Sequence, residues 1–103
     1  MSKLYRIIYY STATEDIISI LDYISIDAPS AANNLIGKIN ESISSLSSFP
    51  FKGTVPRDFY LKSKGYRMLI ISSYIVFYLV NESSEVVEIM RVVSGRQNYR
   101  SFL

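Results

Sequence analysis

The apolar and polar positions in the first half of the chain form two patterns, one typical of a strand and one typical of a helix. Residues 4–10 are rich in β-branched and aromatic side chains, which is typical of a strand. Apolar residues then recur at steps of four, three and four, the spacing of one helix face: Ile17, Leu21, Ile24 and Ala28. Thr12 and Glu15 have the spacing of a capping box, which predicts that this helix begins at Thr12.

Pro29 separates this helix from a second one. Proline cannot continue a helix, but it suits the first position of the next, where its missing N–H has no partner to lose. Residues 30–48 carry a single apolar face: Ala32, Leu35, Ile36, Ile39, Ile43 and Leu46. Two amphipathic helices joined by so short a connection predict a helical hairpin whose apolar side covers a sheet.

The second half of the chain predicts a loop followed by three strands. Residues 51–64 contain Gly53, Pro56 and most of the lysines, which indicates a loop with at most a short turn of structure. Three apolar runs separated by short polar turns follow, as in antiparallel hairpins: 66–71, 74–80 and 85–93. The run 74–80 lacks polar alternation, which predicts a central strand covered on both faces.

These elements follow the order β-α-α-β-β-β. We therefore predict an α+β fold in which an N-terminal helical hairpin packs on a mostly antiparallel sheet. A length of 103 residues suits one domain, and we expect residues 1–103 to form it.

The amino-acid composition limits the kinds of segment and functional site that we expect in this chain. No apolar run approaches the roughly 20 residues that span a bilayer, and no cleavage pattern follows the first residues, so we expect neither a membrane segment nor a signal peptide. The absence of cysteine agrees with a cytoplasmic location. Histidine, the commonest general base and metal ligand, is also absent, so we expect no metal site and no cofactor. Acid–base chemistry would have to use carboxylates, tyrosine, lysine or an arginine-stabilised phosphate.

Charge is distributed unevenly between the two halves of the chain. Residues 1–49 contain three basic and five acidic residues, a net charge of −2. Residues 50–103 contain eight basic and four acidic residues, a net charge of +4. The basic half indicates an acidic partner or nucleic acid. The alternative is an ordinary solvated surface.

The chain ends in a basic and aromatic segment. Arg96, Tyr99 and Arg100 could bind phosphate while the phenol stacks on a base. Alternatively, Tyr99, Phe102 and Leu103 dock the C-terminus on the sheet. The two interpretations are compatible.

Arg67 and Arg91 stand in otherwise apolar strands. Each needs a solvent-facing side or a partner, because an unpaired buried charge is costly. Arg91 either belongs to a functional face or pairs with Glu88 or another surface carboxylate. The face of the sheet on which Arg91 lies depends on whether its strand is regular, because a bulge would turn Arg91 to the other face. Asp16 and Asp22 are interpreted as charges on the helix surface, not as a catalytic pair.

Several short motifs occur in an order and spacing that resemble one known family. They are Asp16-Ile17, Leu21-Asp22-Tyr23-Ile24, Pro29-Ser30-Ala31-Ala32, Phe49-Pro50 with Gly53, Gly65-Tyr66-Arg67, Tyr74-Ile75-Val76-Phe77-Tyr78, Val87-Glu88-Ile89, Arg91-Val92-Val93 and Gly95-Arg96. Together they resemble the RelE/ParE superfamily of toxins from bacterial type II toxin–antitoxin modules, and the helices resemble its ParE-like branch. The resemblance covers nearly the whole chain.

The resemblance implies one of two kinds of target. RelE-like members cut mRNA in the ribosomal A site with basic residues and a C-terminal tyrosine, whereas ParE-like members act on DNA gyrase. Leu69, Ile75 and Gln97 replace basic residues of the RelE pattern, and Ser94 stands where many relatives carry histidine. Tyr99 is out of register with the C-terminal tyrosine. Because losing one electrostatic donor typically costs ~100-fold in rate, these departures favour the ParE-like interpretation.

The resemblance therefore implies a toxin that inhibits DNA gyrase by binding it and is neutralised by a cognate antitoxin. The target-binding residues would be Arg67, Arg91, Arg96, Tyr99 and Arg100. The antitoxin would lay an acidic and apolar segment on the sheet and the hairpin. One alternative is a RelE-like, ribosome-dependent mRNA endonuclease that uses Arg67, Arg96 and Tyr99. Another is an inactivated toxin retained for antitoxin binding.

Overall fold

A computed structural model describes residues 4–96 and residue 103 of the chain. Its elements are β1 (Arg6–Tyr9), α1 (Ser11–Asp27), α2 (Pro29–Ser44), the 3-10 helix η1 (Ser45–Ser47), α3 (Phe59–Ser63), β2 (Arg67–Ile71), β3 (Tyr74–Asn81) and β4 (Val86–Ser94). The predicted order β-α-α-β-β-β and the α+β fold class are confirmed. The loop before β2 contains one short helix, α3.

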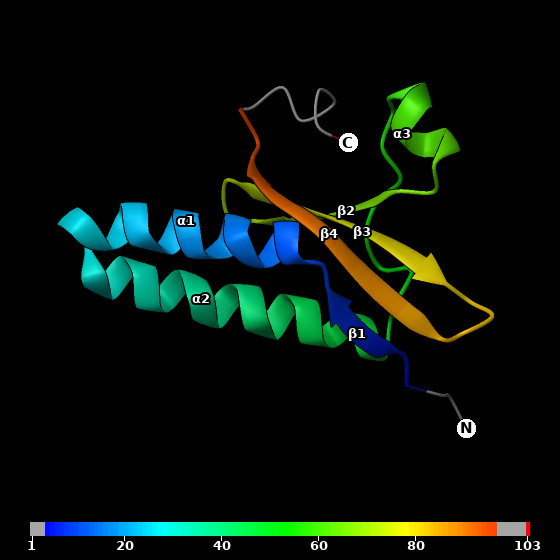
Figure 1. Ribbon diagram of the computed structural model, residues 1–103, viewed down its shortest axis with the longest axis horizontal. Helices are drawn as coiled ribbons and strands as arrows, with labels where there is room; N and C mark the ends of the chain where they lie inside the picture. The colour runs from blue at the N-terminus through cyan, green and yellow to red at the C-terminus, as the bar shows by residue number, and fades with distance from the viewer. Residues whose placement is uncertain (1–3, 97–102) are drawn as a thin grey trace.

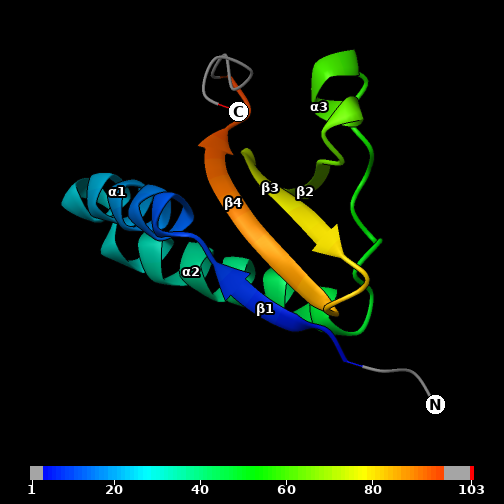
Figure 2. The same ribbon diagram turned by 45° about the vertical axis from the view of Figure 1, so that its right-hand side comes forward.

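The strands form a four-stranded sheet in the order β1-β4-β3-β2. β1 runs parallel to β4, whereas β4, β3 and β2 pair antiparallel, as expected for a mostly antiparallel sheet. Helices α1 and α2 lie side by side as a hairpin (Figure 1), and a second view places this hairpin and α3 on opposite sides of the sheet (Figure 2). No helix within the described part of the chain is both long and apolar enough to cross a membrane.

The sheet separates two hydrophobic cores. The hairpin-side core joins the helices to one face of the strands, and its buried residues are Ala13, Leu35, Ile39, Ile43, Leu46, Leu69, Ile71, Val76, Tyr78, Val87, Ile89 and Val92. The α3-side core covers the other face with Leu61, Tyr66, Ile75, Phe77 and Val93. Alternate residues of β3 therefore enter different cores, which explains its continuous apolar run and confirms that it is a central strand covered on both faces.

A bulge interrupts the pairing of β3 with β4. Tyr78 pairs with Ile89 and Phe77 pairs with Arg91, so Met90 is an extra residue without an opposite partner. Without it, Arg91 would share the face of Ile89 and point toward the hairpin-side core. The bulge instead places Arg91 beside Phe77, on the face of the α3-side core, and returns Val92 to the hairpin-side core.

The predicted capping box at Thr12 and Glu15 is wrong. Helix α1 begins directly after β1, with Tyr10 as its N-cap and no side-chain cap hydrogen bond. The Tyr10 carbonyl oxygen accepts hydrogen bonds from the N–H groups of Ala13 and Thr14. The Thr12 hydroxyl donates to the Met90 carbonyl oxygen at 2.9 Å instead of capping the helix. Because β1 leads directly into α1, the first turn of the helix faces β4. The Thr12 hydroxyl therefore binds the backbone of β4.

Gly53 occupies a position where the backbone passes very close to β3. Its N–H donates to the Tyr78 phenolic oxygen at 2.8 Å. A Cβ atom at this position would lie 2.5 Å from that oxygen and 2.7 Å from the carbonyl oxygen of Met68. A Cβ atom at Gly37, within α2, would have no atom within 4 Å apart from its chain neighbours and the backbone of its own helix. The two glycines therefore differ sharply in the space around them.

We expect Gly53→Ala to lower the free energy of unfolding by about 1–3 kcal/mol, because the methyl group must displace a buried phenol or the strand backbone. Gly37→Ala is the matched control and should raise it by up to about 1 kcal/mol, since alanine favours a helix interior. Urea unfolding followed by circular dichroism measures both. Equal effects of the same sign would contradict the close approach at Gly53.

Candidate functional site

The arginines expected in one functional surface lie on opposite faces of the sheet. Arg67 is paired with Tyr78 across β2 and β3, which places it on the hairpin side. Arg91 is paired with Phe77, on the side of α3. Strand pairing thus separates two residues that the sequence predicted to act together.

Arg67 binds the backbone of the loop that comes before it in the sequence. Its Nη1 atom donates to the carbonyl oxygens of Phe51 at 3.2 Å and Gly53 at 2.9 Å. The guanidinium also lies over the Phe51 ring, 5.0 Å from the ring centroid. These contacts fix the loop against the edge of β2, so much of the hydrogen-bonding capacity of Arg67 serves the fold.

Arg91 pairs with Asp16 of α1, not with Glu88. Its Nε donates to Asp16 Oδ2 at 2.7 Å, and its Nη2 donates to Oδ1 at 2.9 Å, a two-pronged contact between a guanidinium and a carboxylate. The hydrogen bond to Asp16 raises the pKa of Arg91, although partial burial opposes this shift. Glu88 instead accepts a hydrogen bond from the Tyr10 hydroxyl at 2.7 Å, which raises the pKa of that phenol.

Asp16 also binds the backbone of β4. Its Oδ2 atom accepts a hydrogen bond from the Val92 N–H at 3.0 Å, next to the Thr12 contact with Met90. Side chains of α1 therefore form hydrogen bonds with the backbone groups at the edge of β4 beyond the end of β1. The interpretation of Asp16 as a simple surface charge is wrong, because its side chain is only 16% exposed and joins helix to sheet. No local pattern reveals this contact, since 75 residues separate its partners.

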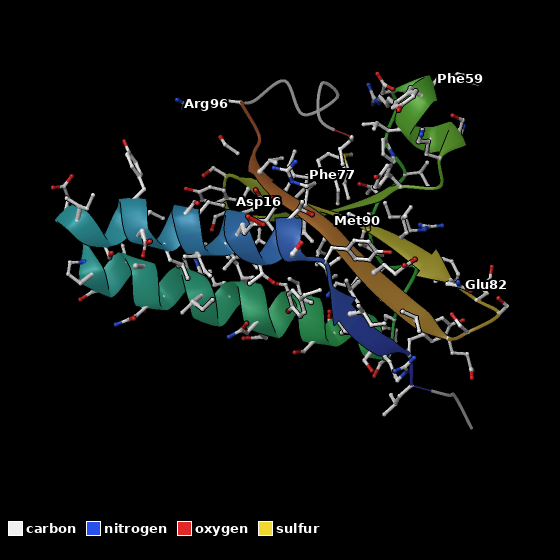
Figure 3. All side chains as sticks on the ribbon, in the orientation of Figure 1. Asp16, Phe59, Phe77, Glu82, Met90 and Arg96 are labelled. Carbon is white, nitrogen blue, oxygen red and sulfur yellow. The ribbon has the colours of Figure 1, made fainter. Side chains whose placement is uncertain are left out.

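An open groove of about 620 Å³ lies between α1 and the end of β4. We call it the α1–β4 groove; it is lined by Asp16, Ser19, Ile20, Tyr23, Tyr74, Arg91, Val92, Val93, Ser94 and Arg96. Arg96 is exposed beyond the end of β4 (Figure 3), and its N–H donates to the Ser94 hydroxyl at 3.3 Å. Arg91 and Arg96 are thus brought to one groove, whereas Arg67 is not part of it. Tyr99 and Arg100 lie outside the described residues.

The last residue of the chain packs over the opposite face of the sheet. Leu103 joins the α3-side core, and its carbonyl oxygen accepts a hydrogen bond from the Tyr60 hydroxyl at 3.3 Å. The prediction that the end of the chain docks on the sheet is therefore supported for Leu103. Tyr99 and Phe102, which were also expected to dock there, lie outside the described residues.

The α1–β4 groove offers groups for binding rather than an assembled acid–base pair. Arg96 and exposed tyrosine and serine side chains can contact a polar or anionic partner. The Asp16 carboxylate already accepts three hydrogen bonds from Arg91 and Val92. Among residues 4–96 and 103, no three Asp, Glu, His or Cys side chains gather as metal ligands do.

The sequence places the chain in a class of proteins, the toxin families of type II toxin–antitoxin systems. The chain belongs to the ParE toxin family of the parDE type II toxin–antitoxin system, whose family model matches residues 5–99. No curated protein matches the chain.

Two solved structures share the fold at low sequence identity. A chain of the chromosomal ParDE system from P. aeruginosa is 18% identical, with a TM-score of 0.72, and the match covers 90% of this chain and 98% of that one. A chain of the RelBE2 toxin–antitoxin complex from Mycobacterium tuberculosis is also 18% identical, with a TM-score of 0.65 and coverage of 91% and 94%. At this identity the likeness establishes the architecture alone.

We expect Asp16→Ala to lower the free energy of unfolding by about 2–4 kcal/mol, because it removes a carboxylate that holds a half-buried guanidinium and a strand N–H. Asp22→Ala, on the exposed side of the same helix, should change it by less than about 0.5 kcal/mol. Urea unfolding of both variants measures the difference. A similar, small effect for both would show that the contact contributes little to stability.

Proposed function

We propose that this chain is the toxin of its module, that it inhibits DNA gyrase by binding it, and that a cognate antitoxin neutralises it. Membership of the ParE toxin family supports the class of activity. The choice of target rests on the resemblance in sequence to the ParE-like branch and on how the described arginines are used. The cytoplasmic location is part of the same proposal, because gyrase and its DNA lie there.

The observation that carries this choice is the dispersal of the basic residues. RNA cleavage requires a proton acceptor for the 2′-hydroxyl and cations gathered around one phosphate. Arg67 binds two loop carbonyls on one side of the sheet, and Arg91 binds Asp16 from the other. Leu69 and Ile75, which replace basic residues of the RelE pattern, are buried in opposite cores. These features support a binding function over RNA cleavage.

The α1–β4 groove is the surface that we propose for target contact. Arg96 is exposed there, and Arg91 lines the wall with its charge neutralised by Asp16. Tyr99 and Arg100 lie outside the described residues, and we propose them as target-binding residues on the sequence resemblance alone. Arg67, from the other face, would contribute through the loop that it holds.

An antitoxin partner is proposed on separate grounds. The solved structures with the same fold come from a ParDE system and from a RelBE2 toxin–antitoxin complex. A toxin of this family also needs a partner that blocks it, because unopposed growth inhibition would harm the cell that makes it.

Purified protein should inhibit supercoiling of relaxed plasmid DNA by gyrase. If Arg96 contacts the target, Arg96→Glu should weaken inhibition at least about tenfold, because reversing a charge at an interface replaces attraction with repulsion. Lys38→Glu reverses another exposed charge, on α2, and serves as the control. No inhibition by saturating wild-type protein would overturn the gyrase proposal.

Induction of the chain without antitoxin distinguishes the alternatives. Growth arrest with codon-positioned cuts in primer-extension mapping would instead indicate a ribosome-dependent mRNA endonuclease. Normal growth would indicate an inactivated toxin retained for antitoxin binding. Growth arrest with intact transcripts is the outcome that we expect.

A further inference from the structure

The first strand of the chain forms an exposed, largely apolar edge of the sheet. β1 lies at the margin of the sheet, next to β4 (Figure 2). We call its outer side the β1 edge; its members are Arg6, Ile7, Ile8, Tyr9 and Tyr10. Ile8 is 39% exposed, and Tyr9 and Tyr10 are each 41% exposed. Exposed large apolar side chains that gather in one region mark binding surfaces more often than those that occur singly.

The backbone groups of Ile7 and Tyr9 point away from the rest of the sheet. The Arg6 N–H donates to the Glu85 carbonyl oxygen at 3.0 Å, and the Tyr10 N–H donates to β4 at the same distance. Because hydrogen-bonding directions alternate along a strand, Ile7 and Tyr9 present their N–H and C=O groups to the outer side. Within the part of the chain that the structure describes, no backbone hydrogen bond satisfies these outward groups.

The open part of the β1 edge is closed at both ends. Before it, the Tyr5 N–H donates to the Ser47 carbonyl oxygen at 2.9 Å, and the Ser47 hydroxyl donates to the Tyr5 carbonyl oxygen at 2.7 Å. After it, the chain enters α1, whose N-cap is Tyr10. The free donors and acceptors of Ile7 and Tyr9 therefore form a short template for one further strand.

The backbone of the β1 edge is complementary to a second copy of itself. When two copies meet antiparallel about a two-fold axis at Ile8, Ile7 of each copy pairs with Tyr9 of the other. Each of these pairs exchanges both hydrogen bonds, so every free N–H and C=O group of the two edges is satisfied. The next possible register in one direction would place Tyr9 opposite Tyr5, which η1 already covers. In the other direction it would place Ile7 opposite Ser11, which belongs to α1.

The side chains of the β1 edge are complementary in the same register. Ile8 lies opposite Ile8 of the second copy, in a pair without hydrogen bonds, where facing side chains are closest. Arg6 lies opposite Tyr10 of the second copy, whose hydroxyl donates to the Glu88 carboxylate at 2.7 Å. Arg6 is exposed and forms no salt bridge within residues 4–96 and 103. The guanidinium of each copy therefore meets the carboxylate of the other.

We propose that two copies of this chain associate through their β1 edges and form one continuous sheet across a two-fold axis. Backbone hydrogen bonds between Ile7 and Tyr9, the contact between the two Ile8 side chains, and two pairings of Arg6 with Glu88 hold the dimer. A second copy fits this edge better than an unrelated strand, because its backbone groups, apolar side chains and charges all occur in the complementary order. The proposal goes beyond gyrase inhibition, and none of these residues lines the α1–β4 groove.

Cysteine cross-linking tests the position of the two-fold axis. The chain has no cysteine of its own, so Ile8→Cys introduces a single thiol. The Cα atoms of an antiparallel pair without hydrogen bonds lie about 4.5 Å apart, within the range that a disulfide bridges. Mild oxidation with diamide should therefore convert most of the Ile8→Cys variant into a covalent dimer on a non-reducing gel. Ile18→Cys places a thiol at a more exposed position on α1, and this control should remain largely monomeric.

Sedimentation equilibrium tests the charge pairing. The wild-type chain should show a monomer–dimer equilibrium that shifts toward the dimer as concentration rises. Arg6→Glu and Glu88→Arg should each weaken the dimer at least about tenfold, because each brings like charges together. The combined variant should regain most of the affinity, since opposite charges then meet again. Glu41→Arg reverses an exposed acidic residue on α2, and this control should leave the dimer unchanged.

Several outcomes would overturn the proposal, and circular dichroism checks that each variant is folded. A wild-type chain that stays monomeric at millimolar concentration is one of them. Equal cross-linking of Ile18→Cys and Ile8→Cys is another, and so is a combined charge variant as weak as the single ones. A dimer that does not cross-link through Ile8→Cys would place the contact elsewhere and overturn it as well. These results are independent of the gyrase assay, because Arg96→Glu should leave the dimer intact.

Discussion

The hydrogen bonds between Asp16 and the outer edge of β4 are the constraint on which the architecture depends. β1 ends at Tyr9, but β4 continues to Ser94, so the second half of β4 would have an open edge without another cover. The first two turns of α1 provide that cover, because Thr12 binds the Met90 carbonyl and Asp16 binds the Val92 N–H. The helix therefore completes the sheet as well as packing on it. This explains why α1 must begin immediately after β1.

The bulge at Met90 makes this arrangement possible and decides what the neighbouring arginine does. By inserting one residue, it turns Arg91 away from the hairpin-side core and lets the guanidinium reach Asp16. Arg67 shows the opposite outcome, since unshifted pairing keeps it on the hairpin side, where it holds loop carbonyls. Two arginines that look equivalent in the sequence thus hold two different parts of the fold. Arg96, beyond the last strand, is exposed to solvent and available for contact.

Charge and exposed apolar area divide the surface into regions suited to different partners. The α1–β4 groove combines Arg96 with hydroxyl groups beside an acidic helix, whereas the segment around α3 combines basic residues with exposed apolar side chains. Helix α1, which forms one wall of the groove, and α3 lie on opposite sides of the sheet (Figure 2).

The sequence by itself determined the order of the elements, the hairpin at Pro29, the covered central strand and the family, because each depends on local periodicity, turn residues or motif order. The limits of β2, β3 and β4 also agree with the pattern to within one residue. Only the tertiary structure decided what the polar residues do. Thr12 matched a local capping rule, but the strand beside it competed successfully for its hydroxyl. The partner of Arg91 and the separation of Arg91 from Arg67 depend on strand pairing and on one bulge, contacts between residues far apart in the chain that no local pattern records.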